Sequence, residues 1–134
     1  MLSQNSISKQ KASTISAVVL AFVGDAVFAL YVREKLSLLT DKKSGQLNAQ
    51  TSKIVCATAQ AKEAERILPL LTEEELLVYK RCRNAKKNTR SKSASVADYN
   101  NSTGFEGLIG YLYLIGETER LLYLLSNAGI DYEN

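Results

Sequence analysis

A long apolar run near the N-terminus constrains the fold more than any other feature. Residues 15–32 (ISAVVLAFVGDAVFALYV) contain a single charged side chain, Asp25. The run is long enough for a short membrane span or a signal sequence. However, a carboxylate in the middle of a membrane helix costs about 2.5–3.5 kcal/mol on insertion scales. We therefore interpret the run as a buried core helix that extends to Leu39 and is capped by Ser13 or Thr14, and we expect no membrane association.

The remainder of the chain also shows helical periodicity, and no stretch alternates with a period of two residues. The pair Thr72 and Glu75 forms a capping-box pattern, Pro69 interrupts the helix that starts near Gln46, and Gly116 and Gly129 are placed to end helices. Helical patterns cover residues 15–39, 46–68, the segment after Thr72, 96–115 and 117–128, and residues 88–95 resemble a loop. We predict an all-α fold of about six helices.

The length of 134 residues predicts one domain that spans 1–134, with a polar, frayed segment at 1–12. The chain has no histidine. This excludes a Ser-His-Asp triad, a histidine general base and a histidine-ligated zinc site. Cys56 and Cys82 fit no metal-binding spacing, so we expect free thiols and a reducing, cytoplasmic location.

Positive charge is concentrated in one segment. Residues 80–92 (KRCRNAKKNTRSK) contain seven basic residues and no acidic residue, whereas the rest of the chain has ten basic and fourteen acidic residues. Lys80, Arg81, Arg83 and Lys87 have offsets that can form one helical ridge facing phosphates. Alternatively, these cations only offset the negative end of a helix dipole. Because few aromatic residues are interleaved, the segment suits the backbone of a duplex better than stacked single-stranded bases.

Two carboxylates stand alone in apolar helices, where we expect both to be buried. Asp25 has no cation within one helical turn, and Glu106 lies among Gly104, Gly107 and Gly110, which leave room for a close neighbour. Asp25 could instead cap a helix or meet a distant cation, and Glu106 could border a contact between helices. Taken with the basic segment and the lack of histidine, the pair suits Mg²⁺ held by carboxylates and acting on a phosphodiester.

Three segments resemble the ribonuclease III family. LAFVGDAVFALYVR (residues 20–33) resembles its signature helix, whereas KRCRNAK (80–86) and STGFEGLIGYLYL (102–114) resemble the subclass called Mini-ribonuclease III. The resemblance implies an all-helical endonuclease domain that forms a homodimer and cuts both strands of an RNA duplex, leaving 5′-phosphates. The substrate implied for the subclass is the large-subunit (23S) ribosomal RNA precursor, and a ribosomal protein could assist cleavage.

The resemblance also implies the roles of individual residues. Asp25 and Glu106 match the catalytic carboxylates that bind Mg²⁺, or Mn²⁺ in its place. The RNA-binding region corresponds to Lys80, Arg81, Arg83, Asn84, Lys86 and Lys87. Full-length members have further carboxylates where this chain has Ala21 and Thr103, so only two remain for each site, and such a site should bind its metal less tightly.

Five further positions depart from the subclass pattern and bear on loop geometry and substrate preference: Asn48, Cys82, Ser91, Ser95 and Asn100. A different class of function remains open on the same fold. A non-catalytic RNA-binding or ribosome-assembly factor would keep the basic segment without needing Asp25 and Glu106.

Overall fold

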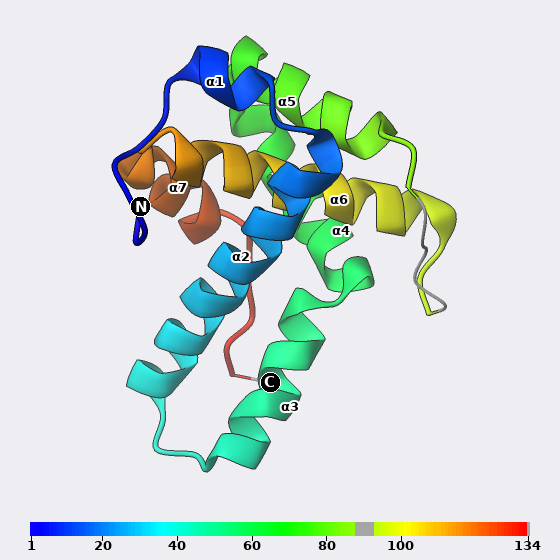
Figure 1. Cartoon of the computed structure of the whole chain (residues 1–134). Helices are drawn as coiled ribbons and strands as arrows, with labels where there is room; N and C mark the ends of the chain where they lie inside the picture. Colours follow the sequence, from blue (N-terminus) through cyan, green and yellow to red (C-terminus); the bar gives the residue numbers. More distant parts are fainter. Residues whose placement is uncertain (88–92, 134) are drawn as a thin grey trace.

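The computed structural model describes residues 1–87 and 93–133, and within them every regular element is a helix (Figure 1). The elements are α1 (Lys9–Ser13), α2 (Ala17–Leu39), α3 (Ser44–Val55), α4 (Ala57–Ile67), the 3₁₀ helix η1 (Leu68–Leu70), α5 (Glu73–Asn84), α6 (Val96–Leu114) and α7 (Thr118–Ser126). The all-α prediction is confirmed, with seven α-helices in the described part instead of about six. No helix in these residues combines the length and apolarity that a bilayer span requires.

Helix α6 is the centre of the fold. It packs against α2, α4, α5 and α7, and Figure 1 shows α2 and α6 crossing each other. Almost every residue from Ser102 to Leu112 is buried. Across the crossing, the rings of Phe28 and Phe105 meet edge to face with their centroids 5.2 Å apart. The apolar run 15–32 therefore supplies core residues, as predicted for a core helix.

Two glycines allow α2 and α6 to approach this closely. A Cβ atom on Gly24 would lie 1.7 Å from the carbonyl oxygen of Glu106, and one on Gly110 would lie 2.0 Å from the carbonyl oxygen of Leu20. These atoms belong to the backbone, so they cannot move aside as a flexible side chain would. Any larger residue at either position would push the helices apart.

The other face of α6 meets α5 through two more glycines. A Cβ atom on Gly107 would lie 2.3 Å from the sulfur of Cys82, and one on Gly104 would lie 2.8 Å from the ring of Tyr79. Cys82 is fully buried and is a free thiol, as is the exposed Cys56. The sequence departure at Cys82 is therefore a packing feature, because this side chain occupies the space above Gly107.

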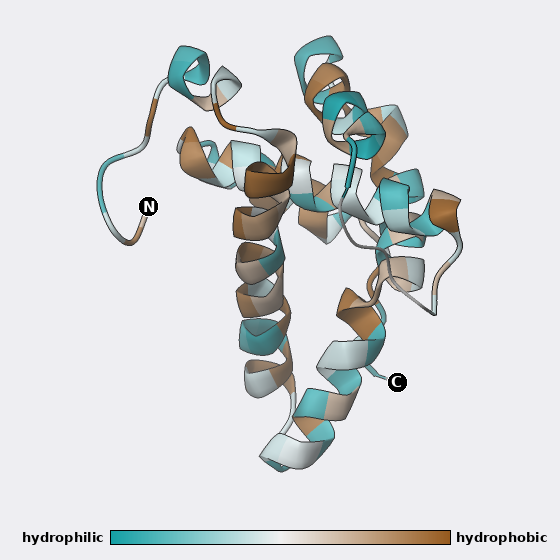
Figure 2. Cartoon of the chain, turned by 45° about the vertical axis from the view of Figure 1, so that its right-hand side comes forward, coloured by the Kyte–Doolittle hydropathy of each residue, from teal (hydrophilic) through white to brown (hydrophobic). Residues whose placement is uncertain are grey.

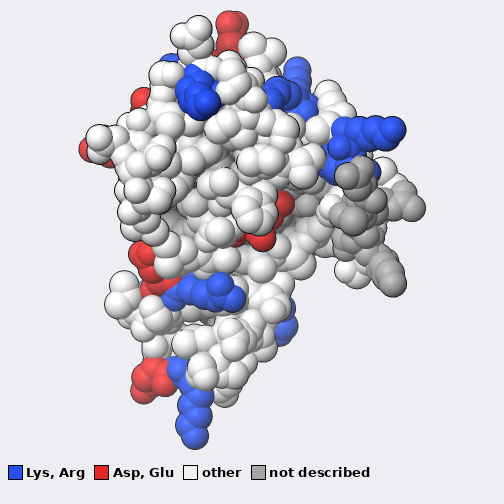
Figure 3. All heavy atoms as spheres, in the orientation of Figure 1, with Lys and Arg blue, Asp and Glu red and all other residues white. Residues whose placement is uncertain are grey.

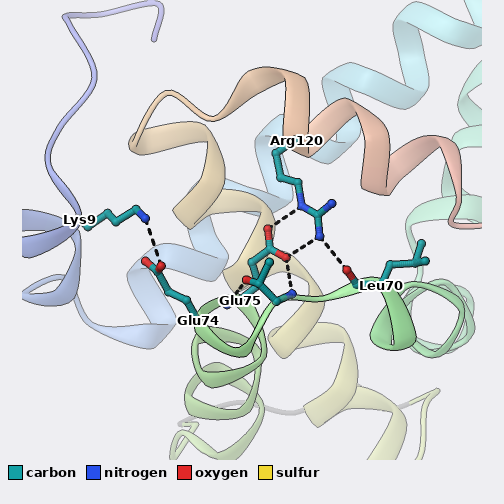
Figure 4. A network of polar contacts seen from close by, with 6 residues as sticks. Lys9, Leu70, Glu74, Glu75 and Arg120 are labelled. Carbon is teal, nitrogen blue, oxygen red and sulfur yellow. Dashed lines mark hydrogen bonds and ion pairs between the residues drawn. The ribbon is translucent and has the colours of Figure 1, made fainter.

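A polar network ties α5 to its neighbours (Figure 4). The Arg120 guanidinium on α7 donates to both carboxylate oxygens of Glu75, at 2.8 Å each, and to the carbonyl of Leu70 at 2.7 Å. Lys9 forms an ion pair with Glu74 at 3.1 Å. Glu75 also completes the capping box predicted with Thr72. One residue thus serves both the start of α5 and its contact with α7.

The N-terminal segment makes several contacts with the rest of the domain. Ser8 caps α1, Ala12 is fully buried, and the backbone N–H of Ile7 donates to the carbonyl of Leu114 at 2.9 Å. Residues 2–6 and 8–11 are exposed, and the fraying expected for residues 1–12 stays a prediction.

The helix boundaries shift by a few residues. Ser16, instead of Ser13 or Thr14, caps α2, and the side-chain oxygen of Ser16 accepts from the N–H of Val19. The helical pattern after Gln46 divides at Cys56, whose extended backbone separates α3 from α4. Gly116 and Gly129 have positive φ angles of 81° and 69° and follow the two last helices. Of the loop expected at 88–95, residues 88–92 lie outside the described part.

Candidate active site

The crossing of α2 and α6 brings the two predicted carboxylates together. Asp25 follows Gly24 on α2, and Glu106 on α6 provides the carbonyl against which Gly24 packs. The side chains of Asp25 and Glu106 are within hydrogen-bonding reach of each other, and this contact affects the pKa of Glu106. Two residues that are far apart in the sequence are thus held together where the backbones of α2 and α6 meet at Gly24.

The two carboxylates differ in burial, and for Asp25 this corrects the sequence-based interpretation. We expected Asp25 to be a buried carboxylate, but it is exposed, as are Phe22 and Ala26 on the same helix. Only the other side of α2 enters the core, so an apolar helix can still present a carboxylate to solvent. Glu106 is half-buried. The pair therefore lies at the rim of the core with one side open to solvent.

Burial and the neighbouring carboxylate raise the pKa of Glu106. Desolvation makes the largest contribution to a pKa of about 8, and the hydrogen bond and negative charge of Asp25 raise it further. The amide of Gln60 acts in the opposite direction and lowers the pKa. No cation in residues 1–87 and 93–133 lowers the pKa of this carboxyl group, so a bound cation would stabilise its ionised form.

Gln60 is a member of this site that the sequence analysis missed. It lies on α4, is 1% exposed, and its Nε2 donates to Oε2 of Glu106 at 3.4 Å. The available signal was a glutamine at a core-facing position of an alanine-rich helix, where Ala61, Ala64 and Ile67 are buried with it. A polar residue in such a row indicates a buried hydrogen-bond partner.

The donor set fits a hard cation that keeps several water ligands. Among residues 1–87 and 93–133, no cluster of three or more histidine, cysteine, aspartate or glutamate side chains could hold a metal. The pair Asp25 and Glu106 nevertheless offers oxygen ligands on an open rim. Mg²⁺ is commonly bound by one or two carboxylates and retains several waters, and Mn²⁺ suits the same ligands. The residues present therefore fit such an ion.

The six predicted RNA-binding residues lie at the C-terminal end of α5 and just beyond it. Lys80, Arg81, Asn84 and Lys86 are exposed, whereas Arg83 and Lys87 are half-buried. Figure 3 shows basic side chains at this end of α5. The segment therefore presents positive charge on one edge of the domain.

The predicted ridge is not continuous, because α5 ends at Asn84 and Lys87 lies beyond it. Lys87 donates to the carbonyl oxygens of Arg83 at 3.0 Å and Ala85 at 2.7 Å, as expected for a cation at a helix C-terminus. Arg81 donates to the carbonyl of Ile15. Arg83 packs over the ring of Tyr79 at 5.8 Å. Part of the basic segment therefore has a structural role in addition to its charge.

Comparison with known proteins agrees with this arrangement. A family profile described as Ribonuclease III domain matches residues 18–117. The chain is 45% identical to a Mini-ribonuclease 3 of Thermoanaerobacter sp. (strain X514), over 89% of this chain and 84% of that protein. It is 44% identical to a Mini-ribonuclease 3 of Clostridium tetani, over 85% of this chain and 76% of that protein.

A solved structure supports the fold independently. The crystal structure of a protein from Fusobacterium nucleatum superimposes with a TM-score of 0.76 at 30% identity and covers 84% of this chain and 90% of that one. The profile match, the sequence identities and the shared fold extend over the helices that carry Asp25 and Glu106. The chain therefore belongs to the ribonuclease III family of double-strand-specific endoribonucleases, and its sequence places it with the Mini-ribonuclease 3 proteins.

Proposed function

We propose that this protein is a Mg²⁺-dependent endoribonuclease in which Asp25 and Glu106 are the catalytic metal ligands. The observation that supports this most strongly is that the two carboxylates meet at the crossing of α2 and α6. This proximity contributes to the raised pKa of Glu106, which is about 8. Two acidic groups held this close are unfavourable unless a proton or a cation lies between them. A metal site explains why the fold maintains them side by side.

The chemistry is hydrolysis of a phosphodiester. Mg²⁺, or Mn²⁺ in its place, would polarise the phosphate and make a bound water more acidic. Asp25 and Glu106 would hold the ion, and the open rim beside Asp25 would admit the RNA backbone. Water adds to phosphorus, the P–O3′ bond breaks, and the products are a 5′-phosphate and a free 3′-hydroxyl. No histidine base is needed, in agreement with its absence from the chain.

The basic end of α5 supplies the second part of the proposal. Lys80 and Lys86 are exposed and available to phosphates, and Arg81, Arg83, Asn84 and Lys87 complete the predicted RNA-binding edge. Contacts to phosphate release counterions, so affinity for duplex RNA should fall steeply with salt. The double variant Lys80→Ala with Lys86→Ala should weaken binding and flatten this salt dependence. Its matched control is the double variant Lys42→Ala with Lys43→Ala. These two exposed lysines lie between α2 and α3, outside the predicted RNA-binding edge.

A homodimer would place two such sites on one duplex. The start of α2 presents Val18, Val19 and Phe22 to solvent, with Phe22 77% exposed, and Figure 2 shows this helix as strongly apolar along its first turns. An unpaired apolar surface of this kind is typical of a protein interface. We propose that this face, extended by Leu30, contacts a second copy across a two-fold axis.

The biological substrate we propose is the precursor of 23S ribosomal RNA in the cytoplasm, with a ribosomal protein as a possible aid that shapes the RNA. This follows from the resemblance of the chain to Mini-ribonuclease III. The alternative is an RNA-binding assembly factor on the same fold. It would bind duplex RNA through the basic edge and would not depend on Asp25 and Glu106.

Cleavage of an end-labelled RNA duplex distinguishes these functions. The wild-type protein should cut both strands with Mg²⁺ and neither strand with EDTA. Asp25→Asn and Glu106→Gln should abolish cutting while the far-UV circular dichroism spectrum stays unchanged. Glu34→Gln, which alters an exposed carboxylate elsewhere on α2, should cut normally. Duplex binding without cleavage, tested also on structured ribosomal precursor RNA, would favour the assembly factor.

A further inference from the structure

Gln60 combines two features that rarely occur together in a helix core: a polar side chain and nearly complete burial. It is 1% exposed on the face of α4 that packs against α6. A buried amide costs about 1–3 kcal/mol when it lacks hydrogen bonds. A leucine or methionine would fill the same space without that cost, so packing alone does not account for a glutamine here.

The partner of Gln60 is Glu106. The Nε2 atom donates to Oε2 of this carboxylate at 3.4 Å from the interior side, while Asp25 approaches from the open side. Three helices therefore meet at one side chain: α2 through Asp25, α4 through Gln60, and α6 through Glu106 itself. A glutamate side chain has three rotatable bonds, so a contact from one side alone would leave its carboxylate poorly oriented.

Two carboxylates that both bind a cation cannot also hydrogen-bond to each other. If both carboxylates held one ion, their contact with each other would be lost, whereas the amide of Gln60 would still be placed to donate to Glu106. A carboxylate has about four lone-pair positions, so one amide hydrogen bond leaves the others free for a cation and its waters. Such outer hydrogen bonds to ligating groups affect metal affinity by about 10–100-fold.

We propose that Gln60 is a positioning residue: its amide holds the Glu106 carboxylate in the orientation in which Glu106 and Asp25 bind one metal ion. This inference rests on the metal-dependent function proposed above. Gln60 does not touch the reacting phosphate. It acts through Glu106, so its loss should raise the metal concentration the enzyme needs and leave the rate at saturating metal close to that of the wild type.

The chain contains a matched control for this test. Gln50 on α3 is 6% exposed, and its Nε2 also donates a hydrogen bond, to the carbonyl of Tyr132 at 3.2 Å. This glutamine is also buried and also donates one hydrogen bond through its amide, but its partner is the C-terminal segment and not a carboxylate of the site. The substitutions Gln60→Met and Gln50→Met therefore remove the same chemical group from two comparable positions.

The experiment measures direct binding of Mn²⁺ by electron paramagnetic resonance, without RNA, and the half-saturating Mg²⁺ concentration for cleavage. For Gln60→Met we expect the dissociation constant of Mn²⁺ and the half-saturating Mg²⁺ concentration each to rise about 10-fold or more. The kcat at saturating Mg²⁺ should stay within about twofold of the wild type. Gln50→Met should match the wild type in both. If Gln60→Met does not fold, as judged by circular dichroism, Gln60→Leu takes its place.

The outcomes separate this inference from the function on which it rests. Metal binding by Gln60→Met that equals the wild type, while Glu106→Gln loses binding, would overturn the positioning role and leave the metal site intact. Equal losses in Gln60→Met and Gln50→Met would also overturn it, because they would reflect a general loss of packing. A wild type that binds Mn²⁺ no better than Glu106→Gln would overturn the metal site and the inference together.

Discussion

The close crossing of α2 and α6 leads to a sharp prediction for Gly24→Ala. A methyl group at this position would lie 1.7 Å from the carbonyl oxygen of Glu106 and 2.9 Å from the backbone nitrogen of Gly110. Ordinary contacts begin near 3.4 Å. Because the obstructing atoms are backbone, the two helices would have to separate by roughly 1.5 Å.

The energetic cost follows from what this separation disrupts. Overpacking a core costs about 1–3 kcal/mol, and more when no side chain can yield. Separation also weakens the edge-to-face contact of Phe28 and Phe105, which contributes about 0.5–1.5 kcal/mol beyond burial. The higher helix propensity of alanine returns about 1 kcal/mol. We expect a net loss of about 3 kcal/mol, a large share of the roughly 5–15 kcal/mol that stabilises a domain.

Urea denaturation followed by far-UV circular dichroism, at one fixed protein concentration, measures this loss. Gly45→Ala on α3 is the matched control, because a Cβ atom there meets nothing within 4 Å. It should be neutral or stabilise the protein by about 0.5 kcal/mol. Gly24→Ala should also lose cleavage activity at temperatures where it remains folded, since Glu106 moves relative to Asp25. A Gly24→Ala variant as stable as the wild type would refute the reasoning.

Three further predictions concern charge and assembly. The folded-state pKa of Glu106, about 8, lies above its unfolded value of 4.5, so its contribution to stability is complete below pH 4.5 and is lost as pH rises towards 8. In EDTA, the stability of Glu106→Gln relative to the wild type should therefore increase as pH rises from 4.5 to 8. The difference in the free energy of unfolding, measured by urea denaturation, has an upper bound of about 5 kcal/mol. A difference that does not change with pH would contradict this. Arg120→Met leaves the buried Glu75 carboxylate unpaired and should cost about 2–3 kcal/mol at pH 7. Because Arg120 holds the pKa of Glu75 below its usual value, this cost should shrink as pH falls below 4.5, and equal costs at pH 7 and pH 3 would contradict the assignment. Phe22→Ala should weaken the proposed dimer at least about 10-fold in sedimentation equilibrium, whereas Leu38→Ala, at the other end of α2, should not; an unchanged dimer would place the interface elsewhere.

Local features of the fold were predictable from the sequence because they depend on neighbouring residues. Helical periodicity and the absence of alternation gave the all-α class. The capping box of Thr72 and Glu75 and the glycines after the last two helices are contacts over a few residues, and the structure has them at the predicted positions. The hydrogen bond of Ile7 to Leu114 could not be predicted, because it joins residues that are far apart in the chain.

The candidate site also combines features that residue type indicates with features that depend on tertiary contacts. The sequence singled out Asp25 and Glu106 as charges without local partners, and their chemical type indicated a metal that acts on phosphate. Their proximity depends on Gly24 and Gly110, which let two helices approach within backbone contact. Apolar residues occur on every side of α2, so the residue pattern does not indicate which side faces solvent, and the expectation that Asp25 is buried is wrong.

By itself, then, the sequence determined the helical class, the capping box of Thr72 and Glu75 and the glycines that follow the last two helices, and it singled out the two carboxylates as candidates, since each depends on residue type and local spacing. Only the tertiary structure decided that Asp25 is exposed, that Glu106 is half-buried with a raised pKa, and that Gln60 joins them from a third helix. Burial and electrostatic coupling depend on distances between atoms that are far apart in the chain. Those distances are set when α2, α4 and α6 pack together.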